Sequence, residues 1–360
     1  MRKLFQSGGE LGVQDLGGDR YEMNISVPRD SDGRMARECP DHECSPGYFK
    51  VTPGTCITEN HLQAYCPYCR HSAEPNNFTT QEQQRYAKDL VMREVQKNLN
   101  GVIKDALGLG ANGKRKFGGG LISMEMSLKE SPLPHVRRPF EDDVRRDVIC
   151  PHCSLDQTVF GLAVWCADCG TDIFMSHINA EVSVTRQMLG DVQRRTEMLG
   201  KRVAAKDLEN CLEDGVSLFE AAMRALVRRA LIERGGAAED VERQLTKLGN
   251  AFQNIGRTRH QMAELFAVTV PEYGVWGVLA TAFEKRHPIT HNLGVVDRKY
   301  LERAKAAERH GREVRIVATE IEQMLAALYE AIAFVHGALF PMHLPRSDDA
   351  QAEVNSHQVE

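Results

Sequence analysis

The chain has 360 residues, which is enough for two or three domains with at least one sizeable core. Hydrophobic residues make up 42% and charged residues 26%, and the formal net charge is -5. This balance excludes a polyelectrolyte that binds nucleic acid over its whole surface, so nucleic-acid contacts must come from local basic patches. No apolar run reaches the ~20 residues of a membrane-spanning helix, and residues 1–20 lack a signal-peptide-like apolar stretch. We therefore expect a cytoplasmic protein with no membrane partner.

The ten cysteines are unevenly distributed, because only Cys211 lies beyond residue 170. In a reducing compartment, clustered cysteines are more often metal ligands than disulfides. The first half of the chain is also rich in Gly and Pro, whereas the second half has helical periodicity almost throughout. The sequence thus predicts a multidomain protein with small, β-rich, zinc-ribbon-like modules followed by an all-α helical bundle.

Residues 1–35 are expected to form an irregular N-terminal segment, and residues 36–78 a first zinc-binding module. Two cysteine pairs, spaced Cys-x4-Cys and Cys-x2-Cys, supply the expected ligands of this module: Cys39, Cys44, Cys66 and Cys69. Such spacings fall within the range of structural zinc sites. His42, His71 or Cys56 can replace one member of this quartet, so the ligand set remains open at this point.

Residues 79–146 are expected to contain a helix, a basic glycine-rich loop and a linker. The helix is predicted from Thr79 to Leu107, with Thr79 or Thr80 as its N-cap. The loop follows at residues 108–120, where three basic residues stand between glycines (Lys114, Arg115 and Lys116). A strand is predicted at residues 121–128, and residues 131–139 are a proline-rich connector.

Residues 147–177 predict a second zinc ribbon. The motif Cys150-Pro-His-Cys153 is followed, after twelve residues, by Cys166-Ala-Asp-Cys169. Two Cys-x-x-Cys motifs at this separation place four thiolates around one tetrahedral zinc ion, and a short hairpin around Gly161 is expected between them. Both quartets leave no coordination position open, so we expect about two structural Zn²⁺ ions per chain rather than a catalytic metal.

Residues 178–344 predict the helical domain, and residues 345–360 a disordered acidic tail. Strong helices are expected at residues 181–199 and 203–233, and another at residues 238–255. A further helix is predicted to start at Pro271 and to be interrupted by Pro288. Asp297 is expected to cap one last long helix that reaches about Phe334.

The segment around Pro288 carries the strongest catalytic pattern of the second half. Arg286, His287 and His291 fall within six positions. Proline disfavours helix at the residue before it, so we expect a bent segment that presents these side chains to a ligand. Histidine can give or take the proton of a ribose 2′-hydroxyl, and arginine offers a fixed positive fork for phosphate oxygens. A helix-terminal Arg and His that satisfy terminal carbonyls are the simpler alternative.

Arg286-x4-His291, with polar His287 after the arginine, resembles the R-x4–6-H motif of the HEPN (higher eukaryotes and prokaryotes nucleotide-binding) domain family. The continuation His291-Asn292-x-Gly294-x-x-Asp297-x-x-Tyr300 is similar to that of many members. The resemblance covers roughly residues 180–340. It implies a HEPN-type helical bundle and a metal-independent endoribonuclease whose two protomers join their motifs at a homodimer interface, in a bacterial toxin or antiviral defence role.

By this resemblance, Arg286 stabilises transition-state charge, His291 does acid/base work and His287 supports them. RNA is then the substrate, the products carry a 2′,3′-cyclic phosphate and a 5′-hydroxyl, and the zinc ribbons recognise the target or a protein partner. The alternative is a non-catalytic adaptor, in which the zinc ribbons and the helical bundle bind protein or nucleic acid.

Overall fold

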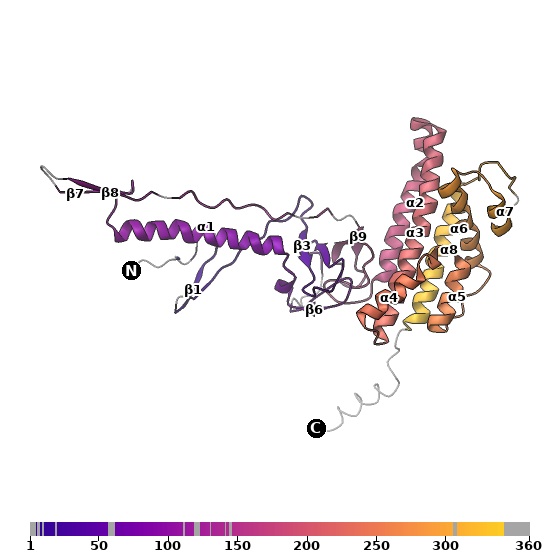
Figure 1. Cartoon of the computed structure of the whole chain (residues 1–360), viewed down its shortest axis with the longest axis horizontal. Coiled ribbons are helices and arrows are strands. Elements are labelled where there is room, and N and C mark those ends of the chain that lie inside the picture. Colours follow the sequence, from indigo (N-terminus) through magenta and orange to yellow (C-terminus); the bar gives the residue numbers. More distant parts are fainter. Residues whose placement is uncertain are drawn as a thin grey trace, which may run out of the picture. The chain divides into compact units, whose positions relative to one another are not determined.

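The computed structural model describes residues 5, 8, 11–18, 20–56, 62–110, 112–118, 123–129, 131–140, 142–143, 146–304 and 308–341. The chain divides into two compact units, Met1–Asp172 and Ile173–Glu360. The first unit holds small β-sheets and one long helix, and the second is helical (Figure 1). This order of a β-rich part and a helical part agrees with the sequence prediction. The expected tail at residues 345–360 lies outside the described residues.

A four-stranded antiparallel sheet is the centre of the first unit. Its strands, in spatial order, are β3 (Met35–Glu38), β4 (Tyr48–Val51), β10 (Asp156–Val159) and β9 (Arg146–Ile149). The two hairpins β3–β4 and β9–β10 are joined through β4 and β10, where Lys50 stands opposite Thr158. The two cysteine groups, expected in separate modules, therefore share one sheet. The hairpin expected around Gly161 does not form, because β10 pairs with β9 and β4 instead.

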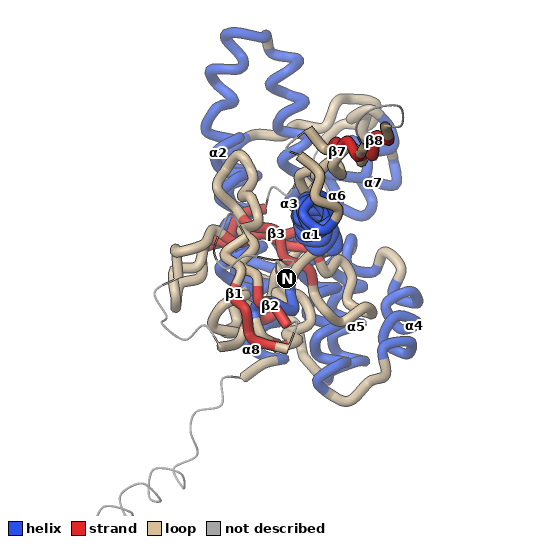
Figure 2. Tube along the Cα trace, turned by 90° about the vertical axis from the view of Figure 1, so that its left-hand side faces the viewer, coloured by secondary structure: helices blue, strands red, loops and turns tan. Residues whose placement is uncertain are grey.

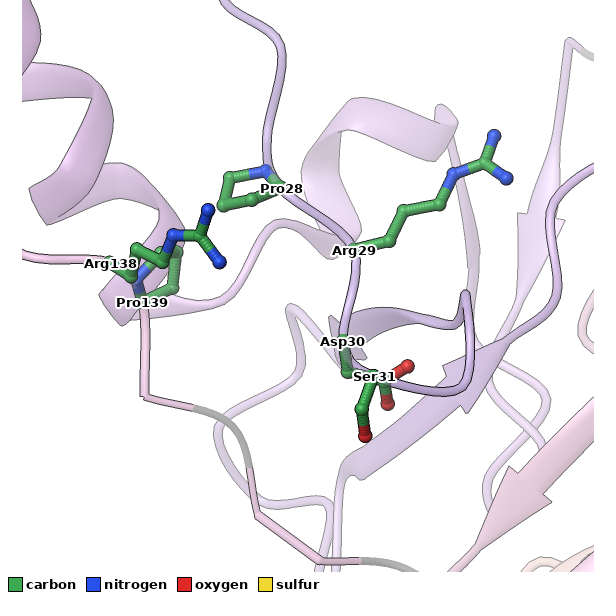
Figure 3. A pocket seen from close by; sticks show the side chains of 6 residues that line it. All are labelled: Pro28, Arg29, Asp30, Ser31, Arg138 and Pro139. Carbon is green, nitrogen blue, oxygen red and sulfur yellow. The ribbon is translucent and has the colours of Figure 1, made fainter.

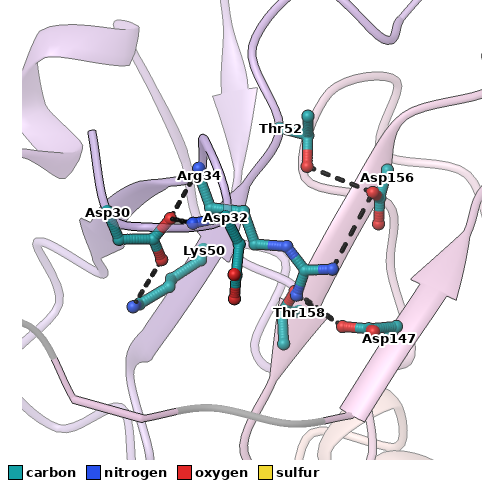
Figure 4. A network of polar contacts seen from close by, with 8 residues as sticks. All are labelled: Asp30, Asp32, Arg34, Lys50, Thr52, Asp147, Asp156 and Thr158. Carbon is teal, nitrogen blue, oxygen red and sulfur yellow. Dashed lines mark hydrogen bonds and ion pairs between the residues drawn. The ribbon is translucent and has the colours of Figure 1, made fainter.

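A polar network covers one face of this sheet (Figure 4). Arg34 contacts Asp147 on β9 and Thr158 on β10. Lys50, which is only 5% exposed, donates to Asp30 at 2.8 Å. Burial raises the pKa of Asp30, but the hydrogen bond from Lys50 and two backbone N–H donors outweigh it and hold the pKa below its usual value. These contacts hold the loop before β3 against β9 and β10, which lie more than a hundred residues later in the chain.

The long helix α1 (Gln81–Ala106) follows the first cysteine group in the chain. A capping box between Thr80 and Gln83 starts α1, close to the predicted start. The N-terminal segment, expected to be irregular, contains the hairpin of β1 (Gln14–Gly17) and β2 (Arg20–Glu22). Its side chains pack with Leu90 and Val95 of α1. The segment expected as a basic loop contains a strand, β7 (Lys114–Phe117), which pairs with β8 (Met124–Ser127).

The helical unit is built on the antiparallel pair α2 (Phe174–Leu199) and α3 (Lys201–Glu233), which run side by side in Figures 1 and 2. Gly200, with φ 89°, provides the turn between them. The apolar residues of α3 at steps of three and four form a stripe that packs in the core: Leu208 is half-buried, and Leu212, Val216, Phe219, Met223, Leu226 and Ala230 are buried. Phe219 makes edge-to-face contacts with Trp276 and Phe283, at centroid distances of 6.2 and 5.3 Å.

The remaining helices differ from the prediction in their boundaries. The helix expected at residues 238–255 ends early as α4 (Ala238–Leu248), and it is followed by a 3-10 turn, η2 (Ala251–Gln253), and by α5 (Ile255–Phe266). Asp297 does act as a cap, since its carboxylate accepts the N–H of Tyr300 at 2.7 Å. The helix after it is short, however: α7 (Arg298–Ala304) is separate from α8 (Ala318–Leu339).

The prediction that Pro288 interrupts its helix is wrong. Helix α6 runs without a break over Val275–Asn292 and includes Pro288. A proline inside a helix removes one backbone hydrogen bond and costs about 3 kcal/mol. Phe283 and Ile289 are buried on either side of it, so core packing holds both flanking turns in place. No helix in the described part of the chain is long and apolar enough to cross a lipid bilayer.

Candidate metal centres and the Arg286–His291 segment

Each Cys-x-x-Cys motif lies in a tight turn whose backbone is set by local sequence. In the motif that starts at Cys150, the N–H of Ser154 donates to the Cys150 carbonyl at 3.0 Å, and the N–H of His152 points at the Cys150 sulfur at 3.4 Å. The residue after the second cysteine has a left-handed backbone in all three Cys-x-x-Cys motifs, at Arg70, Ser154 and Gly170. Such turns direct two sulfur atoms to the same side.

The eight cysteines predicted as ligands gather into two groups of four. In each group the ligand atoms lie within 4.8 Å of one another. The Sγ–Sγ distances are 3.7 Å for Cys39–Cys69 and 3.6 Å for Cys44–Cys66. In the second group they are 3.7 Å for Cys150–Cys169 and 3.4 Å for Cys153–Cys166. A tetrahedron with Zn–S bonds of ~2.3 Å has edges of about 3.8 Å, so the sulfur positions fit a bound metal ion.

The alternatives left open for the first group fall outside it. Cys56, His42 and His71 are all described, and none belongs to the group of mutually close ligand atoms. Cys211, expected as a small core residue, is fully buried in α3. Burial, and then Asp214 and Asp207, raise the pKa of its thiol to about 11, so it stays protonated and inert.

The thiols within each cysteine group differ in their tendency to ionise. Burial raises the pKa of the Cys153 thiol to about 12, and it also raises that of Cys166. One thiol in each group shifts the other way. Hydrogen bonds from Cys44 and Cys66 lower the pKa of Cys69. Hydrogen bonds with Thr171 outweigh burial and lower the pKa of Cys169. Thiols with a raised pKa, such as Cys153, still carry protons at neutral pH. A divalent cation displaces these protons, because metal ligation requires thiolates.

The two metal groups are related by reciprocal backbone contacts. The N–H of Tyr65, just before Cys66, donates to the carbonyl of Ala167 at 2.8 Å. In return, the N–H of Trp165, just before Cys166, donates to the carbonyl of Pro67 at 3.1 Å. Together with the β4–β10 pairing, this arrangement is that of two zinc-ribbon-like halves around a local two-fold axis. A side chain at Gly170 would meet the ring of Tyr65 at 2.9 Å, so the close approach also requires glycine there.

The Arg286–His291 segment occupies the C-terminal half of α6. His287 and His291 are four positions apart on one side of the helix, with ring centroids 5.0 Å apart. His287 is partly buried, and its Nε2 lies 4.0 Å from the Asp297 carboxylate. Burial, with smaller effects from Lys299 and His291, lowers the pKa of His287. His287 therefore gives up its proton at a lower pH than an ordinary histidine.

Arg286 is held on a different side of α6 from His291. A helix turns ~100° per residue, so positions five apart face directions ~140° apart. Arg286 Nη1 donates to Gln253 Oε1 at 3.0 Å, and Gln253 Nε2 donates to Glu220 at 2.7 Å. The Nε atom of Arg286 is buried and has no hydrogen-bond acceptor within the described residues. Within one protomer, the structure brings the two histidines together but does not bring Arg286 to His291.

Gln253 and Glu220 are site residues that the sequence prediction missed. Gln253 lies in η2 and Glu220 in α3, so they reach Arg286 from elements far away in the sequence. No spacing rule connects Glu220 with Arg286. The one signal in the sequence is that Glu220 is a charged residue beside Phe219, which belongs to the apolar stripe of α3.

A shallow pocket in the first unit offers little chemistry. It has a volume of about 190 Å³ and is lined by Pro28, Arg29, Asp30, Ser31, Arg138 and Pro139. Arg138 extends toward Pro28, whereas Arg29 extends away from it (Figure 3). Asp30 is already engaged by Lys50. The pocket therefore lacks converging groups for catalysis.

No protein-family model, no curated protein and no solved structure matches this chain.

Proposed function

We propose that the helical unit is a HEPN-type domain that cleaves single-stranded RNA at a composite site made by two copies of the chain. His291 serves as the general acid or base, His287 supports it, and Arg286 stabilises the charge that develops on the phosphate. The 2′-hydroxyl attacks the adjacent phosphorus, which leaves a 2′,3′-cyclic phosphate on one product and a 5′-hydroxyl on the other.

The observation that carries this proposal is the pair of histidine rings 5.0 Å apart at the C-terminal end of α6, where His291 is exposed and His287 is half-buried. Arg286, which precedes His287 in the chain, has an unsatisfied buried Nε. Two imidazoles at this distance can divide proton removal and proton delivery between them. Structural arginines normally have every buried N–H satisfied, so the unpaired Nε of Arg286 favours a ligand-binding role. Its guanidinium is positioned in advance by Gln253, as transition-state stabilisation requires.

An exposed apolar residue supports assembly at this end of α6. Leu293 follows the histidines, is 90% exposed, and has a left-handed backbone with φ 50°. Val295, two residues later, is 40% exposed. A two-fold interface through these residues would bring the His291 side chain of each protomer toward the other, and would pair each histidine set with a second arginine.

The metal centres complete the proposal as structural zinc sites. Four cysteine ligands per site fill a tetrahedral zinc ion and leave no position for water, so they supply folding energy rather than chemistry. The zinc-binding unit then has the role of recognising the target or a protein partner. We place the protein in the cytoplasm because clustered cysteine ligands are typical of a reducing compartment. A toxin or antiviral defence role follows from the resemblance to the HEPN family.

The decisive experiment is an RNA-cleavage assay on the purified full-length chain with and without EDTA. We expect cleavage of RNA but not DNA, products with a cyclic phosphate, and activity that persists through short exposure to EDTA. His291→Ala should lose roughly 10²–10⁴-fold, the usual contribution of a general acid or base. His310→Ala, another histidine of the same unit, is the matched control and should retain activity. If His291→Ala is as active as wild type, the cleavage comes from a contaminant and the proposal fails.

The dimer has its own test. Leu293→Glu places a charge in the proposed interface and should convert dimer to monomer in light scattering, with loss of cleavage in parallel. Tyr273→Glu changes another exposed side chain (81% exposed) at the opposite end of α6 and should leave the dimer intact. A wild-type chain that is strictly monomeric at micromolar concentration would rule out a composite site.

The second candidate is a non-catalytic adaptor, and one observation favours it. Arg286 and His291 face different sides of α6, and Gln253 already occupies one nitrogen of Arg286. In that case the Arg286–His291 segment has a structural role in the helical bundle. The two units then bind protein or nucleic acid without cleaving it. Full binding of RNA with no cleavage by the wild-type dimer would decide for the adaptor.

A further inference from the structure

The β7–β8 hairpin is exposed on both faces. Every residue of its two strands is exposed except Phe117, which is half-buried. A lone two-stranded hairpin is marginally stable in water. Within the described residues, its contacts come from the end of α1, where the Leu107 carbonyl accepts a hydrogen bond from Arg115 at 3.2 Å. Both faces of the ribbon are therefore open to a ligand.

The two faces of this ribbon have different chemistry. Arg115 stands opposite Met126, and Phe117 opposite Met124, so these residues form one face. Met124 is 66% exposed. The guanidinium of Arg115 lies 4.6 Å from the centre of the Phe117 ring and covers one side of it. This face thus combines an aromatic ring, two thioethers and a positive charge.

The opposite face is mainly basic. Lys114 and Lys116 lie on it, opposite Ser127 and Glu125. Lys114 pairs with Glu125 at 3.4 Å. Lys116 has no ion-pair partner among the described residues, and neither has Arg115 on the other face. The ribbon therefore carries positive charge that the described part of the protein does not neutralise.

The charge of the surrounding segment is opposite to that of the rest of the chain. Residues 81–140 contain eleven Lys and Arg but six Asp and Glu. The whole chain has a net charge of -5, so the remaining residues carry an excess of ten acidic groups. Positive charge concentrated in one segment of an acidic protein marks the place where a polyanion binds.

Helix α1 holds the ribbon at a distance from the metal-binding sheet (Figure 1). Its 26 residues span about 39 Å. Its first turn is anchored, because the buried Gln83 donates to the Ala36 carbonyl of β3 at 3.0 Å. The connector returns beside the helix, where Gln96 donates to the carbonyls of Ser131 and Pro132. Within this unit, α1 and the hairpin form an arm with the basic ribbon at its end.

We propose that this arm, α1 with the β7–β8 hairpin, binds single-stranded RNA. Lys114, Arg115 and Lys116 contact phosphates, and the face with Phe117 stacks on unpaired bases. Basic groups interleaved with an aromatic ring suit single strands, because every base offers a flat face. Double-stranded RNA is a poor fit, because its major groove is too narrow for a ribbon. The choice of RNA over DNA rests on the function proposed for the α6 segment, whereas binding by the arm does not require cleavage.

The test measures binding of a fluorescein-labelled single-stranded RNA by anisotropy over a range of salt concentrations, with the full chain carrying His291→Ala so that the probe stays intact. Lys114→Gln/Arg115→Gln/Lys116→Gln should weaken binding at least tenfold at low salt. The slope of log K against log salt should fall by about 2, since each phosphate contact on a single strand contributes about 0.7. Phe117→Ala should weaken binding about tenfold through lost stacking.

A matched control removes the same charge elsewhere. Lys201→Gln/Arg202→Gln/Lys206→Gln changes three exposed basic residues at the start of α3 and should leave RNA affinity unchanged. Equal losses in both triple variants would mean non-specific attraction and would overturn the proposal. Tighter binding of duplex DNA than of single-stranded RNA would also overturn the proposal. A third contrary result is binding of phosphatidylserine vesicles that depends on Lys114, Arg115 and Lys116 when RNA binding does not depend on them.

The same experiment separates this inference from the proposed function. If the wild-type chain binds RNA through the arm but does not cleave it, the catalytic proposal is wrong and the RNA-binding proposal for the arm stands. If the arm triple variant cleaves RNA with unchanged KM and binds RNA with unchanged affinity, the RNA-binding proposal for the arm is wrong and the catalytic proposal stands.

Discussion

The two units of this protein are stabilised in different ways. Among the residues that the structure describes, ten of the twelve largest fully buried side chains lie in the helical unit and two, Phe49 and Phe78, lie in the first. The strands of the first unit have four residues or fewer. A core this small supplies little hydrophobic stabilisation, so we expect metal binding by the two cysteine groups and cross-strand contacts to compensate for it. The helical unit needs neither, because Trp276, Phe219 and their neighbours form a continuous core.

The sharpest way to test this contrast is to remove the metal. Structural zinc contributes about 10–16 kcal/mol to small domains. Cys166→Ser should therefore unfold the four-stranded sheet while the helical unit keeps its far-UV circular dichroism. Because the two halves share reciprocal bonds, zinc measured by mass spectrometry should fall from about two ions per chain to near zero. Retention of one ion would show that the halves fold independently, and Cys56→Ser is the control expected to keep both.

The next largest effect concerns the arginine of α6. Arg286→Ala should lower kcat by roughly 10²–10³-fold, as loss of a transition-state hydrogen-bond donor does. Arg286→Lys should not restore it, since an ammonium lacks the planar fork. Gln253→Ala should cost about tenfold or more in kcat with little change in KM, because it only positions Arg286. A Gln253→Ala enzyme with unchanged kcat, measured on the same RNA, would remove this positioning role.

A smaller effect is expected from the polar network on the sheet. Lys50→Met leaves the Asp30 carboxylate without its main partner and should lower the free energy of unfolding of the first unit by about 1–3 kcal/mol. The pKa of Asp30 is lowered in the folded protein, so its contribution is present above the unfolded pKa of ~3.9 and is lost as pH falls through the folded value. The difference in the free energy of unfolding between Lys50→Met and wild type, measured by urea titration, should therefore become smaller at acid pH. An equal difference at every pH would contradict this.

The smallest effect is on pH dependence. Burial, Lys299 and His291 lower the pKa of His287, so the acid limb of the cleavage profile should lie below the ordinary histidine value of ~6.5. Cleavage should rise with pH through this limb as His287 loses its proton. Lys299→Gln removes one repelling charge and should move the limb upward by a fraction of a pH unit. A limb that stays in place would mean that His287 does not titrate in the reaction.

Local patterns determined much of this protein from sequence alone. The grouping of the eight cysteines is confirmed, and for six of them the reason is local, because a Cys-x-x-Cys turn fixes two sulfur atoms through its own backbone. The buried stripe of α3 and the cap of α1 followed in the same way, since helix geometry relates residues three or four apart. In each case the interacting groups are close in the chain.

Tertiary structure decided the features that depend on distant residues. The two cysteine groups form one sheet because β4 and β10 pair across about a hundred residues, and no short pattern encodes that register. Helix α6 passes through Pro288 because Phe283 and Ile289 are buried on both sides, which outweighs the local cost of proline. Gln253 reaches Arg286 only because η2 lies against the bundle. Local propensity is weak compared with core packing, so these positions could be assigned only once the elements were placed in space.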